Sequence, residues 1–143
     1  MPLVTEESGT GMLIPEELFH QGVNAYNQND FFEAHELWEE LWSDYPIKDR
    51  ILVQGLIQVA VSFYHLYSDN LKGARSLMEK ALSKFQHGID SGKKLISYGQ
   101  IDWENFVSNL VLCQKELEVI STCVDFNREL IPEIIFSSRR ENE

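Results

Sequence analysis

Cysteine and long hydrophobic runs are scarce in this 143-residue chain, and each shortage excludes a class of protein. The two cysteines, Cys113 and Cys123, form no Cys-x-x-Cys pair of the kind that indicates zinc or redox chemistry. They lie ten residues apart in a predicted helix, nearly three turns, so a disulfide between them is geometrically unfavourable. We expect two reduced thiols in or beside the core.

The most apolar stretch runs from Ile51 to Leu66, but Gln54, Gln58 and His65 interrupt it. It therefore predicts a buried helix rather than a membrane span. The N-terminal residues are acidic and lack the basic flank and apolar run of a secretory signal peptide. We expect a soluble protein of the cytoplasm or a comparable reducing compartment.

Positive charge is also in short supply. Twelve lysines and arginines face 23 acidic residues, which gives a formal net charge of −11. Such a surface repels phosphate backbones, so a broad nucleic-acid footprint is not expected.

Apolar residues recur at helical spacing in five segments, and no strand pattern of any length is present. The segments span about residues 15–26, 31–42, 49–67, 71–86 and 103–124. We predict an all-α fold, a compact bundle of about five helices, preceded by a flexible leader at 1–13 and followed by a frayed tail at 137–143. The single helical domain spans 14–136. Its third helix is apolar almost all round and is expected at the centre.

The second and fourth predicted helices resemble each other at an offset of forty residues. Asp30-Phe31-x-x-Ala34 is repeated as Asn70-Leu71-x-x-Ala74. The pattern looks like the second helix of a tetratricopeptide repeat, in which a small residue lets paired helices approach closely. The period is too long and the copies too few for a solenoid, so we predict tetratricopeptide-like helical hairpins only.

A more specific resemblance covers most of residues 15–110. The pattern FxEAHExWExxW from Phe31 to Trp42, followed by RxxxQGLIQxA from Arg50 to Ala60, is similar to the family called domain of unknown function 309. NxxGA at 70–74 and GxID at 99–102 resemble the same family. The resemblance implies a small helical bundle found in bacteria, including cyanobacteria, and in plastids. It assigns no established activity, and the cofactor, if there is one, is unknown.

Polar side chains in the otherwise apolar second and third helices mark a candidate site. His35 and Glu39 are neighbours on one helical face, and the polar residues of the third helix fall within a sector of about 80°. Buried polar groups cost about 1–3 kcal/mol each when they are unpaired, so these residues should face partners. The predicted polar pocket comprises His35, Glu39, Trp42, Arg50, Gln54, Gln58 and His65.

Several interpretations of this pocket stay open. It could be a structural network that fixes helix packing, with Arg50–Glu39 as one ion pair. It could instead bind a small molecule, or a metal ion held by His35, Glu39 and His65 with an open position for water. A metal is not favoured, because the second histidine of an HExxH motif is missing, glutamines are weak ligands and Arg50 would repel a cation.

The function predicted from these residues is a helical binding or structural-interaction domain with an unidentified protein or small-molecule partner. The alternative is a metal-assisted hydrolase or other small-molecule enzyme that uses His35, Glu39 and His65, with Arg50 binding an anion. A homo-oligomer would also suit apolar residues left at the surface. The acidic face formed by Glu33, Glu36, Glu40 and Asp44 is either a solvated surface or a docking surface for a basic partner.

Overall fold

The computed structural model describes residues 14–94 and 98–136, so the predicted leader at 1–13 and tail at 137–143 lie outside it. The described chain contains five α-helices and no strand, which confirms the all-α prediction. The helices are α2 (Pro15–Asn27), α3 (Phe31–Asp44), α4 (Arg50–Tyr67), α5 (Leu71–Asp90) and α6 (Trp103–Val119). Two 3-10 turns follow, η2 (Cys123–Asp125) and η3 (Arg128–Leu130).

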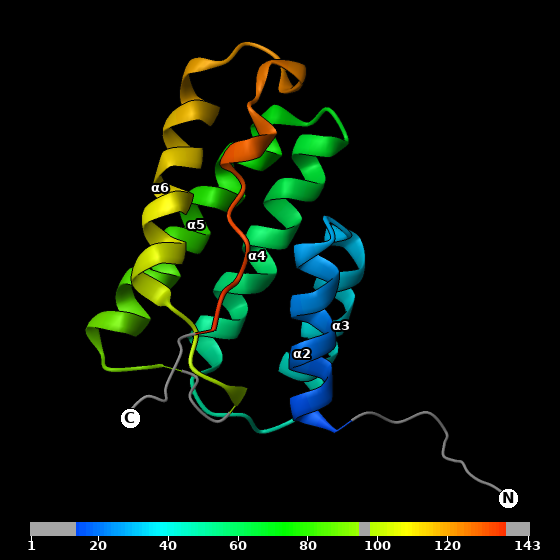
Figure 1. Ribbon diagram of the computed structural model, residues 1–143, viewed down its shortest axis with the longest axis vertical. Coiled ribbons are helices and arrows are strands. Elements are labelled where there is room, and N and C mark those ends of the chain that lie inside the picture. The colour runs from blue at the N-terminus through cyan, green and yellow to red at the C-terminus, as the bar shows by residue number, and fades with distance from the viewer. Residues whose placement is uncertain (1–13, 95–97, 137–143) are drawn as a thin grey trace, which may run out of the picture.

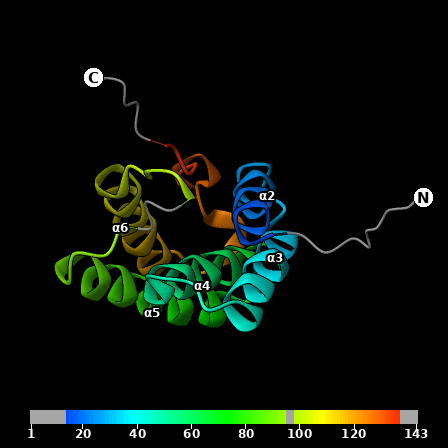
Figure 2. The same ribbon diagram turned by 90° about the horizontal axis from the view of Figure 1, so that it is seen from below.

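The helices run alternately up and down, and each packs against the next along the chain from α2 to α5. Figure 2 shows α3, α4 and α5 side by side in one layer, with α2 and α6 on the same side of it. α4 lies in the middle of that layer, so the predicted central position of the third helix is confirmed. The tetratricopeptide likeness of the hairpins is not confirmed.

Sequence capping signals place the helix starts. Pro15 occupies the first turn of α2, where its missing N–H costs nothing. The side chains of Asp30, Asn70 and Asp102 each accept a hydrogen bond from the backbone N–H three residues on. Each is a short polar side chain directly before the first residue of its helix, the usual N-cap pattern.

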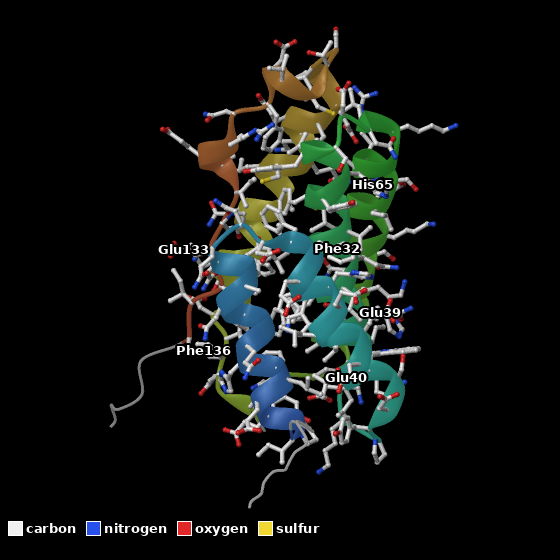
Figure 3. The ribbon with its side chains drawn as sticks, turned by 90° about the vertical axis from the view of Figure 1, so that its right-hand side faces the viewer. Phe32, Glu39, Glu40, His65, Glu133 and Phe136 are labelled. Atoms are coloured by element: carbon white, nitrogen blue, oxygen red, sulfur yellow. The ribbon has the colours of Figure 1, made fainter. Side chains whose placement is uncertain are left out.

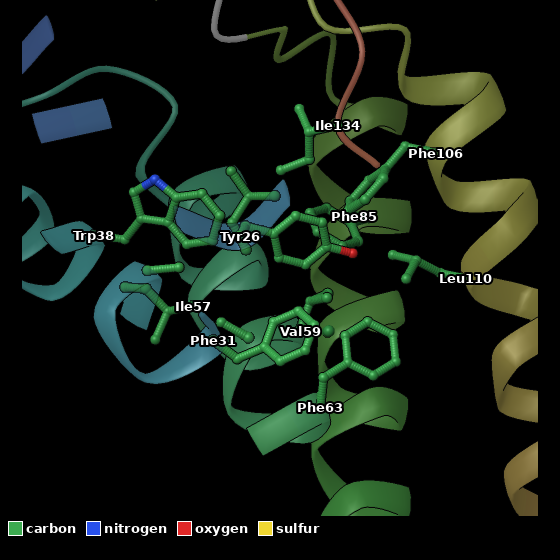
Figure 4. Packing of buried hydrophobic residues seen from close by; sticks show 14 of the residues in the cluster. Tyr26, Phe31, Trp38, Ile57, Val59, Phe63, Phe85, Phe106, Leu110 and Ile134 are labelled. Atoms are coloured by element: carbon green, nitrogen blue, oxygen red, sulfur yellow. The ribbon is translucent and has the colours of Figure 1, made fainter. Parts of the chain in front are cut away.

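The core lies between the two layers and combines aliphatic side chains with a cluster of aromatic rings. Tyr26 sits near its middle, with its ring centroid 6.2 Å from that of Trp38 and 6.0 Å from that of Phe106 (Figure 4). The indole N–H of Trp38 donates to the Phe19 carbonyl at 3.2 Å, so the polar atom of this buried ring is satisfied.

Residues 131–136, the C-terminal strap, run back between α2 and α6 (Figure 1). The Asn27 side chain donates to the Ile134 carbonyl at 3.1 Å and accepts from the Ile134 N–H at 2.9 Å. The Tyr26 hydroxyl donates to the Pro132 carbonyl at 2.7 Å. The strap thereby closes the side of the core that α2 and α6 leave open.

Two helix ends differ from the sequence prediction. α5 continues through His87 and Gly88 to Asp90, because Gly88 packs against α4, where an added Cβ would lie 2.7 Å from a methyl of Leu52. α6 ends at Val119 rather than near Val124. Its last carbonyls are satisfied from α5, since the Arg75 guanidinium donates to Leu117 and Ile120 at 2.7 and 2.8 Å.

Both cysteines are free and buried, as expected. Cys123 lies in η2 and not in α6, which corrects the prediction that the two thiols share a helix. Burial raises the pKa of the Cys113 thiol to about 12, so it stays protonated and donates to the Leu130 carbonyl at 3.4 Å. Among the helices of the described ranges, none combines the length with the apolar character that a bilayer crossing requires.

Gly22 of α2 makes room for the Trp38 side chain of α3, because a Cβ there would overlap the Trp38 indole. Gly22→Ala is expected to lower the free energy of unfolding by about 1–3 kcal/mol through overpacking, although alanine gains up to about 1 kcal/mol in helix propensity. Urea unfolding checks the effect, with the exposed neighbour Gln21→Ala as a matched control. Equal stabilities for the two variants would show that the helices are not in contact here.

Candidate functional site

The predicted polar residues lie on the outer face of the three-helix layer, away from α2 and α6. Gln54, Gln58 and His65 are half-buried along the outward stripe of α4. The layer is covered by helices on one side only, so these side chains reach the boundary with solvent instead of a closed interior. Figure 3 looks onto the α3 edge of this layer and shows Phe32, Glu39 and Glu40 one below another along α3, with His65 of α4 above Phe32.

A hollow of about 240 Å³ opens between the three helices of the layer and is called here the Gln58 hollow. Its walls are Glu39 and Trp42 from α3, Gln54, Ile57, Gln58 and Val61 from α4, and Leu77 from α5. The Gln58 side-chain oxygen Oε1 is buried and has no hydrogen-bond partner among the described residues. An unpaired buried acceptor is unusual in a folded protein and points to a missing donor.

A second hollow of about 130 Å³, the Tyr64 hollow, lies farther along the same seam. Phe32 and His35 of α3 and Val61, Tyr64 and His65 of α4 form its walls, whose exposed surface is almost entirely carbon. The rings of Phe32 and Tyr64 lie with centroids 5.6 Å apart and are 51% and 41% exposed. Val61 lines both hollows, so the two adjoin along the seam between α3 and α4, and together they are called here the α3–α4 groove.

His35 and Glu39 are neighbours, as their spacing predicts. The His35 Nε2 is 4.0 Å from a Glu39 carboxylate oxygen, and its Nδ1 is 3.7 Å from Glu36. His65 contacts the start of α5 instead. Its Nδ1 lies 3.0 Å from the side-chain nitrogen of Asn70, and the side-chain oxygen of Asn70 caps α5.

Arg50 does not form the ion pair with Glu39 that the sequence suggests. Its guanidinium lies over the Trp42 ring, 4.3 Å from the centroid, and donates to the Tyr45 carbonyl at 3.1 Å. The Trp42 indole N–H donates in turn to the Arg50 carbonyl at 3.2 Å. Arg50 therefore secures the turn between α3 and α4 and leaves the Glu39 carboxylate without a cation from this residue.

No group of three or more histidine, cysteine or carboxylate side chains in the described part of the chain could hold a metal ion. The alternative ligand set of His35, Glu39 and His65 is thus not gathered at one point. His35 and His65 share the walls of the Tyr64 hollow, whereas Glu39 belongs to the walls of the Gln58 hollow.

The helix that forms one wall of the groove, α3, is strongly acidic. It carries five carboxylates and no lysine or arginine: Glu33, Glu36, Glu39, Glu40 and Asp44. α4 has no lysine and no carboxylate, its single arginine, Arg50, stands at its first position, and α5 contributes only Leu77 to the walls of the Gln58 hollow. Of the five carboxylates, Glu39 is the one that lines the groove, so it is the anionic group that a ligand there would meet.

Phe32 and Tyr64 belong to the groove but not to the pocket predicted from the sequence. Each stands one position after a buried residue of its own helix and therefore lies outside the apolar face of that helix. A second phenylalanine at the start of an acidic helix, outside its apolar face, was the available signal for Phe32.

The fold and the groove define a small all-α domain with an open groove on one face. Residues 19–77 match the family model described as "Domain of unknown function (DUF309)". The matched segment contains every residue that lines the groove.

Two similar proteins come from bacteria. The chain is 31% identical over 114 residues to the "Uncharacterized protein YpuF" of Bacillus subtilis (strain 168), an alignment over 71% of this chain and 66% of that protein. It is 28% identical over 67 residues to an "Uncharacterized protein" of Aquifex aeolicus (strain VF5), over 46% of this chain and 20% of that protein. The chain thus spans just under two thirds of the first relative and a fifth of the second.

Proposed function

We propose that this chain is a binding domain that receives a cationic, hydrogen-bond-donating group in the Gln58 hollow. The observation that carries the proposal is the buried Gln58 Oε1 without a partner among the described residues. An unpaired buried acceptor costs about 1–3 kcal/mol. A ligand that donates to this oxygen would remove that cost on binding.

The size of the hollow favours a group larger than water. A water molecule occupies about 30 Å³ of liquid, whereas the hollow measures about 240 Å³. The remaining walls include Ile57, Val61 and Leu77, which suit the aliphatic stem of an amine or guanidinium.

The charge of the site favours a cation. Glu39 stands at the rim with its side chain 49% exposed, and Arg50 is held against Trp42 instead of against this carboxylate. An incoming ammonium or guanidinium would meet the Glu39 carboxylate and the Gln58 carbonyl together, a charge-assisted arrangement. An anion would meet repulsion from the same carboxylate.

Binding is favoured over catalysis because the buried, unpaired atom among the described residues, Gln58 Oε1, is an amide oxygen, which neither takes up nor releases a proton at neutral pH. The binding partner is a protein or a small molecule that presents a cation. Two free thiols suit a reducing compartment such as the cytoplasm.

Titration with n-butylguanidinium, followed by NMR of the tryptophan indole and glutamine amide protons, tests the proposal. We expect saturable shifts at Trp42 and Gln58, with an affinity in the millimolar range that suits so small a ligand. Uncharged n-butylurea should bind more weakly, since it cannot pair with Glu39.

Gln58→Leu is expected to abolish these shifts and to raise the free energy of unfolding by about 1 kcal/mol, because it removes the unpaired acceptor. Gln114→Leu, on α6 and equally half-buried, is the matched control. The proposal is wrong if the ligand causes no saturable shift, or if Gln58→Leu binds it as the parent chain does.

A further inference from the structure

We propose that the α3–α4 groove docks a basic amphipathic helix of a partner protein. A lysine or arginine of that helix enters the Gln58 hollow, and an apolar side chain two turns away enters the Tyr64 hollow. The inference rests on the proposed function for the first hollow and adds the second hollow, the class of partner and its spacing.

Continuity of the groove supports a single extended occupant. Both hollows share Val61, and their α4 walls follow one stripe from Gln54 to His65. Their middles lie about six residues apart along α4, which is about 9 Å at the rise of an α-helix. Residues seven apart on a helix face the same way and are separated by about 10 Å. A helix lying along the groove would therefore present one side chain to each hollow.

The Tyr64 hollow supplies the apolar anchor point. Phe32 and Tyr64 leave large parts of their rings exposed, although the core beneath is fully packed. Aromatic side chains around a small apolar depression are typical of the centre of protein interfaces. His35 and His65 complete the walls of the Tyr64 hollow.

Charge complementarity selects the partner. The groove has one carboxylate, Glu39, in its wall, four more acidic residues lie on the same helix, and the chain as a whole carries a formal charge of −11. A second copy of this chain would oppose the same acidic helix to itself across a two-fold axis, which like-charge repulsion disfavours. A helix that carries lysine or arginine fits, since its cations would be attracted to Glu39 and to the acidic helix that carries it.

Selection from a library of random peptides, displayed as fusions to their own mRNA, tests this inference. Peptides of about sixteen residues would span about 24 Å as a helix, long enough to reach both hollows. We expect enrichment of basic peptides in which Lys or Arg stands seven residues from Phe, Leu, Ile or Met. Their affinity, measured by fluorescence anisotropy, should fall about tenfold in Glu39→Gln and again about tenfold in Tyr64→Ser.

Matched changes on α6 serve as controls. Glu118→Gln and Leu112→Ser alter an exposed carboxylate and an exposed leucine away from the groove, and should leave peptide affinity unchanged.

The inference is overturned if no peptide is enriched, if the enriched peptides lack the basic and apolar pair, or if Tyr64→Ser leaves their affinity intact. If peptide binding is lost in Glu39→Gln but not in Tyr64→Ser, while the parent chain still binds n-butylguanidinium, the docking helix is ruled out and the proposed function stands. If the parent chain does not bind n-butylguanidinium either, both are ruled out. Concentration-dependent dimerisation that Tyr64→Ser abolishes would assign the groove to a second copy of this chain.

Discussion

Trp38→Ala is expected to lower the free energy of unfolding by about 4 kcal/mol, near the upper end for a buried aromatic. The side chain is completely buried between α2 and α3, and its indole N–H satisfies the carbonyl of Phe19. Truncation would open a large cavity and leave that buried carbonyl without its donor. Urea unfolding followed by far-UV circular dichroism measures the loss.

Trp42 provides the control for this change, because it lies one turn farther along α3 and is only half-buried. Trp42→Ala removes the stacking with Arg50 and one hydrogen bond, so we expect a loss of about 1–2 kcal/mol. Similar losses for the two tryptophans would contradict the placement of Trp38 in the core and of Trp42 at the groove.

Ile134→Ala is expected to lower the free energy of unfolding by about 3 kcal/mol, because the strap carries this side chain into the core. Ile134 is 3% exposed and its neighbour Ile135 is 51% exposed, so the two residues differ in burial while sharing the same chemistry. Ile135→Ala should cost less than about 1 kcal/mol. Thermal unfolding of both variants measures the difference, and equal costs would show that the strap does not dock as described.

The helices could be predicted from the sequence because their signals are local. Apolar spacing and the caps at Asp30, Asn70 and Asp102 all lie within a few residues of the element that they define. The end of α6 could not be predicted, because Arg75 of another helix supplies the donors at Leu117 and Ile120. Long-range hydrogen bonds of this kind have no local sequence pattern.

The candidate site was predictable in part for the same reason. Helical spacing places Gln54 and Gln58 on one stripe and His35 beside Glu39, and the structure agrees on both points. Spacing does not say which stripe of a helix another layer covers. The strap and α6 cover the inner face of α4, and this arrangement leaves the polar stripe outside.

Arg50 shows a second limit of reasoning from the sequence. Arg50 and Glu39 stand on neighbouring helices, and from the sequence this suggests an ion pair. In the structure the Arg50 guanidinium instead contacts the Trp42 ring and the Tyr45 carbonyl. The consequence is functional, since the Glu39 carboxylate in the wall of the Gln58 hollow forms no ion pair with Arg50 and lies 4.0 Å from the His35 Nε2. A pocket in which Arg50 paired with Glu39 would not favour a cationic ligand.

The central claim concerns one buried oxygen atom, and a crystal structure grown with n-butylguanidinium examines it most directly. The account predicts a guanidinium nitrogen within hydrogen-bond distance of Gln58 Oε1, beside the Glu39 carboxylate. A hollow that holds only water, or a Gln58 Oε1 that accepts a hydrogen bond from a side chain of its own protein, would contradict it.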